Sequence, residues 1–206
     1  MVELSLFVEG GGDTNKLRID CKRGFRIFLE KSGLKGKMPT IVAGGSGAQA
    51  YDKFCTALKM GQRALLLVDS ETAVSETLTS PWIHLRNRPG DSWEKPDAAT
   101  DEHCHLMVQC MENWFLADRD TLRVFFGQGY HDGSLPPPGR NLETVAKHTT
   151  IESLKNATKD CKTKARYHKG EHSFELLARI DPAKVTAASP WAARFVTAVE
   201  TAMTAP

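Results

Sequence analysis

Three acidic side chains follow two apolar runs near the start of the chain, and their type suits metal chemistry. Glu9 comes directly after the first run, at residues 2–8, while Asp69 and Glu71 follow a run at residues 64–68. Asp69 and Glu71 are two positions apart, so on a strand or its extension both would point the same way. Carboxylates gathered without basic partners repel each other, and a divalent cation offsets that repulsion. Hard oxygen ligands suit Mg²⁺ or Mn²⁺, so the pattern predicts a site for one of these ions. The alternative is that all of them are solvated loop acids.

Glycines surround the first of these acids. Gly10, Gly11 and Gly12 follow Glu9 without interruption. Glycine adopts backbone conformations that other residues avoid and adds no side chain, so the run indicates a sharp turn or a close approach by a ligand. A phosphate backbone near Glu9 would satisfy the second explanation.

The segments that must position these acids alternate between strand and helix. Apolar runs predict strands over residues 2–8, 40–43 and 64–68, and stripes at helical spacing predict helices over residues 14–33 and 51–60. This order is typical of a parallel sheet flanked by helices, an α/β fold. Such sheets bind ligands beyond the carboxyl ends of their strands, where all the acids named above are expected to lie.

The rest of the chain is predicted to be mainly helical. We expect residues 72–102 to be irregular, residues 105–110 to form a strand, and residues 112–126 to form a helix or a helix pair. After a loop, further helices are expected near residues 142–147, 151–157, 171–180 and 190–203. Residues 1–118 would then form an α/β core, and residues 119–206 a helical C-terminal extension packed on it.

The composition narrows the class of protein. The formal net charge is only +2, so an anionic partner must be held by local patches. No apolar run is long enough to cross a bilayer, and the N-terminus lacks the pattern of a signal peptide. The five cysteines are odd in number and scattered, which favours reduced thiols. We therefore expect a cytoplasmic protein without a membrane partner.

Two short motifs around the acids resemble those of a known fold. Glu9-Gly10 and Asp69-Ser70-Glu71 resemble the two signatures of the TOPRIM fold, which topoisomerases, primases and OLD-type nucleases share. The usual second signature is Asp-x-Asp, and a final Glu occurs among nuclease branches. Residues 8–13 also resemble the Glu-Gly-x-x-acid form of those nucleases.

Two later stretches narrow the resemblance. Residues 108–118 and residues 167–177 are similar to segments of small TOPRIM proteins from bacterial defence loci. The chain thus resembles, over most of its length, a compact bacterial TOPRIM-like family filed as a domain of unknown function. The resemblance implies a TOPRIM-like parallel sheet and a metal-dependent nuclease of DNA or RNA, acting in an anti-phage system.

The resemblance also implies roles for individual acids. Asp69 and Glu71 would hold the metal, with Glu9 as a further ligand or the general base. Asp13 would support a second metal, and Glu112 would join the same cluster. Each of the last two has a structural alternative, because Asp13 suits a helix N-cap and Glu112 suits the first turn of a helix.

Basic residues complete the expected site. Lys169 is the candidate for neutralising charge in the transition state, with His172 second, although both could lie in an exposed turn. Other basic residues would contact nucleic acid or belong to ordinary solvated surface: Lys16, Lys22, Arg23, Arg26, Arg86, Arg88 and Lys95.

Three further hypotheses concern a partner protein, a second function and a zinc site. The chain has no phosphate-binding loop of the G-x-x-x-x-G-K-[ST] type, so an ABC-type ATPase encoded nearby is a partner that only the resemblance implies. A non-catalytic TOPRIM-like module that binds nucleic acid or nucleotide and regulates that ATPase is the second functional hypothesis. A zinc site at His103, Cys104, His105 and Cys110 is disfavoured, because strand alternation would direct these ligands to opposite faces.

Overall fold

The computed structural model describes residues 3–204 and has an α/β fold built on a parallel sheet. The strands are β1 (Leu4–Val8), β2 (Thr40–Ala43), β3 (Arg63–Asp69) and β4 (Cys104–Met107), in the order β2-β1-β3-β4. Every neighbouring pair is parallel. The prediction of a parallel sheet flanked by helices, with a helical C-terminal region, is confirmed. Val2, which the first predicted strand included, lies outside the described residues.

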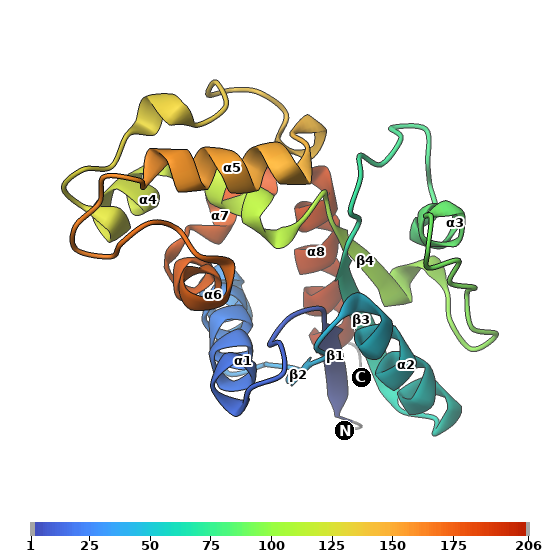
Figure 1. The fold of residues 1–206 in the computed structure, drawn as a ribbon. Coiled ribbons are helices and arrows are strands. Elements are labelled where there is room, and N and C mark those ends of the chain that lie inside the picture. The colour runs from blue at the N-terminus through green and yellow to red at the C-terminus, as the bar shows by residue number, and fades with distance from the viewer. Residues whose placement is uncertain (1–2, 205–206) are drawn as a thin grey trace.

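Helices cover both faces of the sheet (Figure 1). Along the chain they are α1 (Asn15–Leu29), α2 (Gly47–Lys59), α3 (Pro81–Asn87), α4 (Arg119–Phe126), α5 (Lys147–Ala157), α6 (Lys169–Arg179), α7 (Pro182–Ala188) and α8 (Pro190–Thr204). Alternate strand residues face opposite sides, and apolar residues on both sides are buried. Within residues 3–204, no helix has the length and apolarity that crossing a membrane requires.

The C-terminal helices complete the core on one face. α6 packs along α1, and α8 packs on β4. Leu6 on β1, Phe25 on α1, Leu177 on α6 and Phe195 on α8 all belong to one buried cluster. The opposite face buries a second cluster, in which Phe54 of α2 packs against Trp82 of α3. The expected C-terminal extension therefore forms one wall of the sheet's core.

Several element boundaries differ from the predictions. Residues 72–102 contain α3, which starts at Ser80-Pro81, and α7 starts at Asp181-Pro182 where no helix was expected. Both are short helices that begin with a residue favourable at the N-cap followed by proline. The expected strand at residues 105–110 is shorter and ends at Met107, and residues 142–144 form a single 3₁₀ turn before α5.

Candidate functional site

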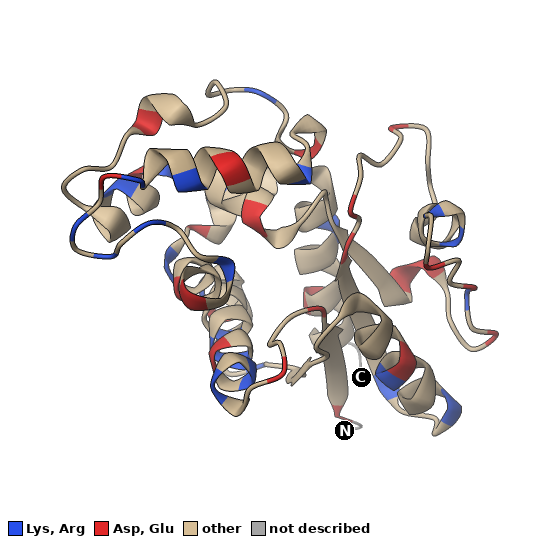
Figure 2. Cartoon of the chain, in the orientation of Figure 1, with Lys and Arg blue, Asp and Glu red and all other residues tan. Residues whose placement is uncertain are grey.

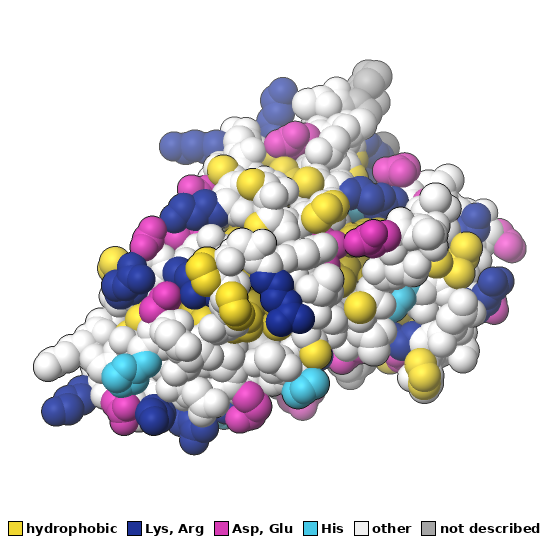
Figure 3. Space-filling model, turned by 90° about the horizontal axis from the view of Figure 1, so that it is seen from above, with side chains coloured by type: hydrophobic (Ala, Val, Ile, Leu, Met, Phe, Trp, Pro, Cys, Tyr) yellow, Lys and Arg dark blue, Asp and Glu magenta, His cyan; other side chains and the backbone are white. Residues whose placement is uncertain are grey.

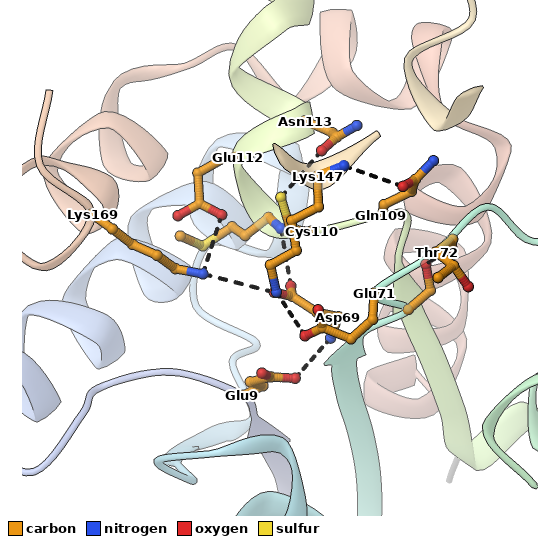
Figure 4. A network of polar contacts seen from close by, with 12 residues as sticks. Glu9, Asp69, Glu71, Thr72, Gln109, Cys110, Glu112, Asn113, Lys147 and Lys169 are labelled. Atoms are coloured by element: carbon orange, nitrogen blue, oxygen red, sulfur yellow. Dashed lines mark hydrogen bonds and ion pairs between the residues drawn. The ribbon is translucent and has the colours of Figure 1, made fainter. Parts of the chain in front are cut away.

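The structure brings together Glu9, Asp69 and Glu71 at the carboxyl edge of the sheet (Figure 4). Glu9 follows β1, Asp69 is the last residue of β3, and these two strands are paired in parallel. One oxygen from each carboxylate lies within 4.8 Å of the others. The parallel pairing is what brings residues that are 60 positions apart in the sequence into contact.

Asp69 is the centre of this cluster and is only 3% exposed. Its backbone N–H donates to Glu9 Oε2 (3.0 Å), and its backbone carbonyl accepts from Arg88 Nη1 (2.5 Å). Its carboxylate Oδ1 accepts from the N–H of Met111 (3.0 Å). These contacts fix both the main chain and the side chain of Asp69 before any ligand binds.

Glu71 reaches the cluster through an unusual backbone conformation. It lies beyond the end of β3 and has a φ of 64°, in the left-handed region that favours glycine. Its N–H donates to the carbonyl of Gln109 (2.9 Å), while Ser70 beside it donates its hydroxyl to the carbonyl of Thr72 (2.6 Å). The turn thus directs Glu71 back toward Asp69, although the two residues do not share a strand face.

Two lysines contact the acids, which corrects the expectation of carboxylates without basic partners. Lys147 Nζ, at the start of α5, lies 2.6 Å from Glu71 Oε1 and 3.1 Å from Asp69 Oδ2. Lys169 Nζ, at the start of α6, lies 3.9 Å from Asp69 Oδ2. Sequence reasoning selected Lys169 and missed Lys147, whose surroundings in the chain show no motif. Gln109 was missed as well, and its side-chain oxygen accepts from the N–H of Lys147 (3.2 Å).

Glu112 is fully buried behind Lys169. Its Oε1 accepts from the hydroxyls of Tyr167 (3.2 Å) and Ser173 (3.1 Å). Its Oε2 has no hydrogen-bond partner in the described structure, and Lys169 Nζ lies 3.5 Å from it. The expected association of Glu112 with the cluster therefore occurs through Lys169, with Glu112 outside the group of converging ligand atoms.

Burial and mutual repulsion disfavour ionised acids at this edge. Burial and the charge of Asp69 raise the pKa of Glu9 to about 7. Burial also raises the pKa of Asp69 to about 6, even though Lys147 acts in the opposite direction. Raised carboxylate pKa values in a cleft are typical of functional sites, and a bound cation would restore the ionised forms.

A cavity of about 250 Å³ lies against Glu9 and Asp69. Gly10, Gly11 and Gly12 form part of its wall and have φ values of 133°, 91° and 48°. Other residues would be strained in these conformations, which explains the glycine run. Lys169 lines the same cavity, so it lies next to both the acids and an accessible space.

The structure does not bring Asp13 or His172 to the three carboxylates. Asp13 is exposed, and Thr14 is the residue that caps α1, by accepting from the N–H of Leu17. The His172 ring is buried against Phe126, and its Nδ1 accepts from the N–H of His168 (3.0 Å). Burial lowers the pKa of His172, and the contacts of the ring are with other aromatic rings and with the start of its own helix.

The expected nucleic-acid residues fall into two groups. Arg88 is buried, forms an ion pair with Asp91 (2.5 Å) and stacks over Trp93, which corrects its expected surface role. Six others are exposed: Lys16, Lys22, Arg23 and Arg26 on α1, Arg86 at the end of α3, and Lys95. α1 also carries Asp20, whose carboxylate lies 2.9 Å from Lys16 Nζ. Acidic and basic positions are distributed over the whole chain (Figure 2), and both signs of charge are mixed over the face in Figure 3.

The residues considered for zinc do not gather into a site. His103, Cys104, His105 and Cys110 form no metal-ligand group within residues 3–204, where Glu9, Asp69 and Glu71 are the group found. His105 instead is buried, with its Nε2 hydrogen-bonded to the carbonyl of Glu102 (3.0 Å). All five cysteines are free thiols.

Comparisons with known proteins yield one match. The model of a family described as a domain of unknown function (DUF4276) matches residues 8–200. Neither the curated proteins nor the solved structures contain a match. The matched span includes all three converging acids and both lysines.

Proposed function

The chain belongs to the DUF4276 family, and we propose that this member is a nuclease that hydrolyses phosphodiester bonds of DNA or RNA with Mg²⁺ or Mn²⁺. The observation that carries the proposal is the convergence of Glu9, Asp69 and Glu71 at the carboxyl edge of a parallel sheet. Ligands of open α/β sheets bind at this edge. The resemblance to TOPRIM nucleases supports the same chemistry.

The donor set fits a hard divalent cation. Three carboxylates offer oxygens within 4.8 Å of one another, and Mg²⁺ commonly takes one or two carboxylates while water and phosphate oxygens complete its shell. Asp69 and Glu71 would hold the ion, with Glu9 as a further ligand or as the base. When bound, such an ion supplies an activated water and stabilises charge on a phosphate.

The residues of the chain would orient the reacting groups. The contacts from Glu9, Arg88 and Met111 hold Asp69 in place, so its carboxylate needs little reorganisation. The Lys169 side chain is 53% exposed at the cavity, where its ammonium can neutralise charge that develops on a phosphate. The exposed basic residues of α1 would bind the flanking phosphates.

The setting of the activity is proposed from the resemblance alone. A bacterial anti-phage effector would act in the cytoplasm and would work with an ABC-type ATPase encoded nearby. A stable complex on co-expression is the expected result for that partner, and separate elution of the two proteins would contradict it.

One observation favours a second candidate function. Lys147 neutralises Asp69 and Glu71 without any metal, as the counter-ion of a binding module would. In that case the chain would bind nucleic acid or nucleotide and regulate its ATPase without cleaving anything.

Cleavage assays separate the two functions. The purified chain is incubated with plasmid, single-stranded DNA and tRNA in Mg²⁺ or Mn²⁺, beside Glu9→Gln and Asp69→Asn. Asp120→Asn is the matched control, because this acid of α4 has a 75% exposed side chain and does not belong to the group of converging acids. A nuclease loses cleavage in the first two variants and keeps it in the control. Binding without cleavage, with the ATPase present, would support the module instead.

A further inference from the structure

The cavity beside the acids has two chemically different sides. Glu9, Asp69 and Lys169 supply charge, while Leu17 of α1, Met111 and Phe174 of α6 supply apolar surface. With the proposed metal ion on the acids, a ligand that fits would combine an apolar part with an anionic part, which the ion and Lys169 would attract. The charged side faces the position that a phosphate would take in the proposed reaction.

The glycine loop lies directly against the apolar residues of the cavity. A Cβ atom at Gly10 would lie 3.0 Å from the ring of Phe174, and one at Gly12 would lie 3.1 Å from Cδ1 of Leu17. The bare backbone thus packs directly against the apolar residues that line the cavity. The cavity opens beside this contact, so a ligand in it would lie against the apolar side chains of Leu17, Met111 and Phe174.

The polar side chains that α6 contributes to the cavity already contact Glu112. The hydroxyl of Ser173 donates to Glu112 (3.1 Å), and Lys169 lies 3.5 Å from the same carboxylate. Sugar hydroxyls placed against Leu17 or Phe174 would lose their hydrogen bonds to water without replacement. A carbohydrate is therefore a poor occupant. An aromatic heterocycle is a better one, because it can place an apolar face on these residues and leave its polar edge in water.

The volume limits how much of a ligand enters. At about 250 Å³ the cavity is smaller than the ~300–1,000 Å³ of pockets that hold drug-sized molecules. It has room for one planar ring system beside the charged groups. Two stacked bases would not fit.

We propose that this cavity binds a single nucleobase, with the attached phosphate directed toward Lys169 and the three carboxylates. The inference rests on the proposed function for the position of that phosphate. It adds the substrate class to that function. A base in the cavity cannot be paired within a duplex, so the ligand is a single strand, a frayed end or a free nucleotide.

Binding assays with and without bases test this inference. Fluorescence anisotropy measures a labelled thymidine 12-mer, an abasic 12-mer with the same phosphates and the matching duplex, with Ca²⁺ as the metal. Base stacking on protein side chains is worth ~1–3 kcal/mol, so the 12-mer should bind about 5- to 150-fold more tightly than the abasic strand. Competition by AMP then distinguishes a free nucleotide from a strand as the source of the base.

A variant that fills the cavity tests whether the preference for bases arises there. Leu17→Trp should reduce the affinity for the 12-mer to that for the abasic strand, and Ile19→Ala should leave it unchanged. Ile19 is on the same helix and is 64% exposed. Unaltered Mn²⁺ binding and thermal melting show that Leu17→Trp keeps its fold and its acids.

The experiments distinguish a failure of the base-site proposal from a failure of the nuclease proposal. Equal affinity of the wild type for both strands, or a base preference that survives in Leu17→Trp, would overturn the inference even if the chain cleaves DNA. Conversely, base-dependent binding without cleavage in Mg²⁺ or Mn²⁺, with the ATPase present, would overturn the nuclease and keep the base site.

Discussion

Lys147 occupies the position of a cation among the acids, so its removal should strengthen metal binding. Its Nζ lies 2.6 Å from Glu71 Oε1 and 3.1 Å from Asp69 Oδ2, the oxygens proposed to hold the ion. A divalent ion on these oxygens would have to displace the ammonium or bind beside it. Lys147→Met removes the charge and keeps most of the side chain's length.

The size of the effect follows from the two ion pairs. The Lys147 side chain is 26% exposed and Asp69 is buried, so the attraction that applies in water, about 1 kcal/mol for each pair at ~4 Å, sets the lower bound. Two pairs give about 2 kcal/mol, which corresponds to a roughly 30-fold lower Kd for Mn²⁺ in the variant.

Isothermal titration with Mn²⁺ measures this change. Lys147 also lowers the pKa values of Glu9 and Asp69, so the titration is run at pH 8.5, where protons compete weakly in both proteins. Lys155→Met, on the same helix and paired with the exposed Glu152, should bind Mn²⁺ as the wild type does. Unchanged or weaker binding by Lys147→Met would refute the idea that lysine and metal compete for these oxygens.

Two further predictions concern buried residues that stabilise the fold. Burial and Arg194 lower the pKa of His105 to about 3, so the folded protein favours its neutral form. The free energy of unfolding should therefore fall by about 4 kcal/mol as the pH drops from 6.5 to 3. Urea unfolding across that range should show a shallower loss for His105→Gln, and equal slopes would contradict the assignment. Arg88→Met should lower the free energy of unfolding by about 3 kcal/mol, because it leaves Asp91 and the carbonyl of Asp69 without their buried partner. Thermal melting checks this second change, and an unaltered midpoint would show that Arg88 is dispensable.

The arrangement of the sheet could be predicted because each local pattern agreed with it. Short apolar runs separated by amphipathic stripes specify strands and helices in turn, and this order permits few other folds. The short helices α3 and α7 were missed because seven residues offer little periodicity. Their Ser80-Pro81 and Asp181-Pro182 starts are the same signal that located α8 at Ser189-Pro190.

The meeting of the acids was predicted for a reason that is only partly correct. Glu9 and Asp69 meet because their parallel strands pair, as expected. Glu71 was expected to share a strand face with Asp69, but it lies past the strand with a φ of 64°. The turn at Glu71 depends on a contact with the segment after β4, because the N–H of Glu71 donates to the carbonyl of Gln109. No local sequence pattern encodes such a contact.

The lysines illustrate the limit of reasoning from local sequence. Lys147 is 76 residues from Glu71, and its position depends on how α5 packs above the sheet. Lys169 was selected only because its segment resembles a family motif. Partners that converge from separate C-terminal helices require the tertiary packing itself.

The roles of Glu9 and Asp69 in the structure decide how much each cleavage variant can show. Asn at position 69 could still accept from the N–H of Met111, but its amide would face Lys147 as one donor against another. Loss of cleavage in Asp69→Asn would therefore combine lost charge with a disturbed centre. Gln at position 9 retains an oxygen for the N–H of Asp69, so Glu9→Gln removes charge while preserving that contact. The Glu9 variant thus carries the chemical argument, and Asp69→Asn serves to corroborate it.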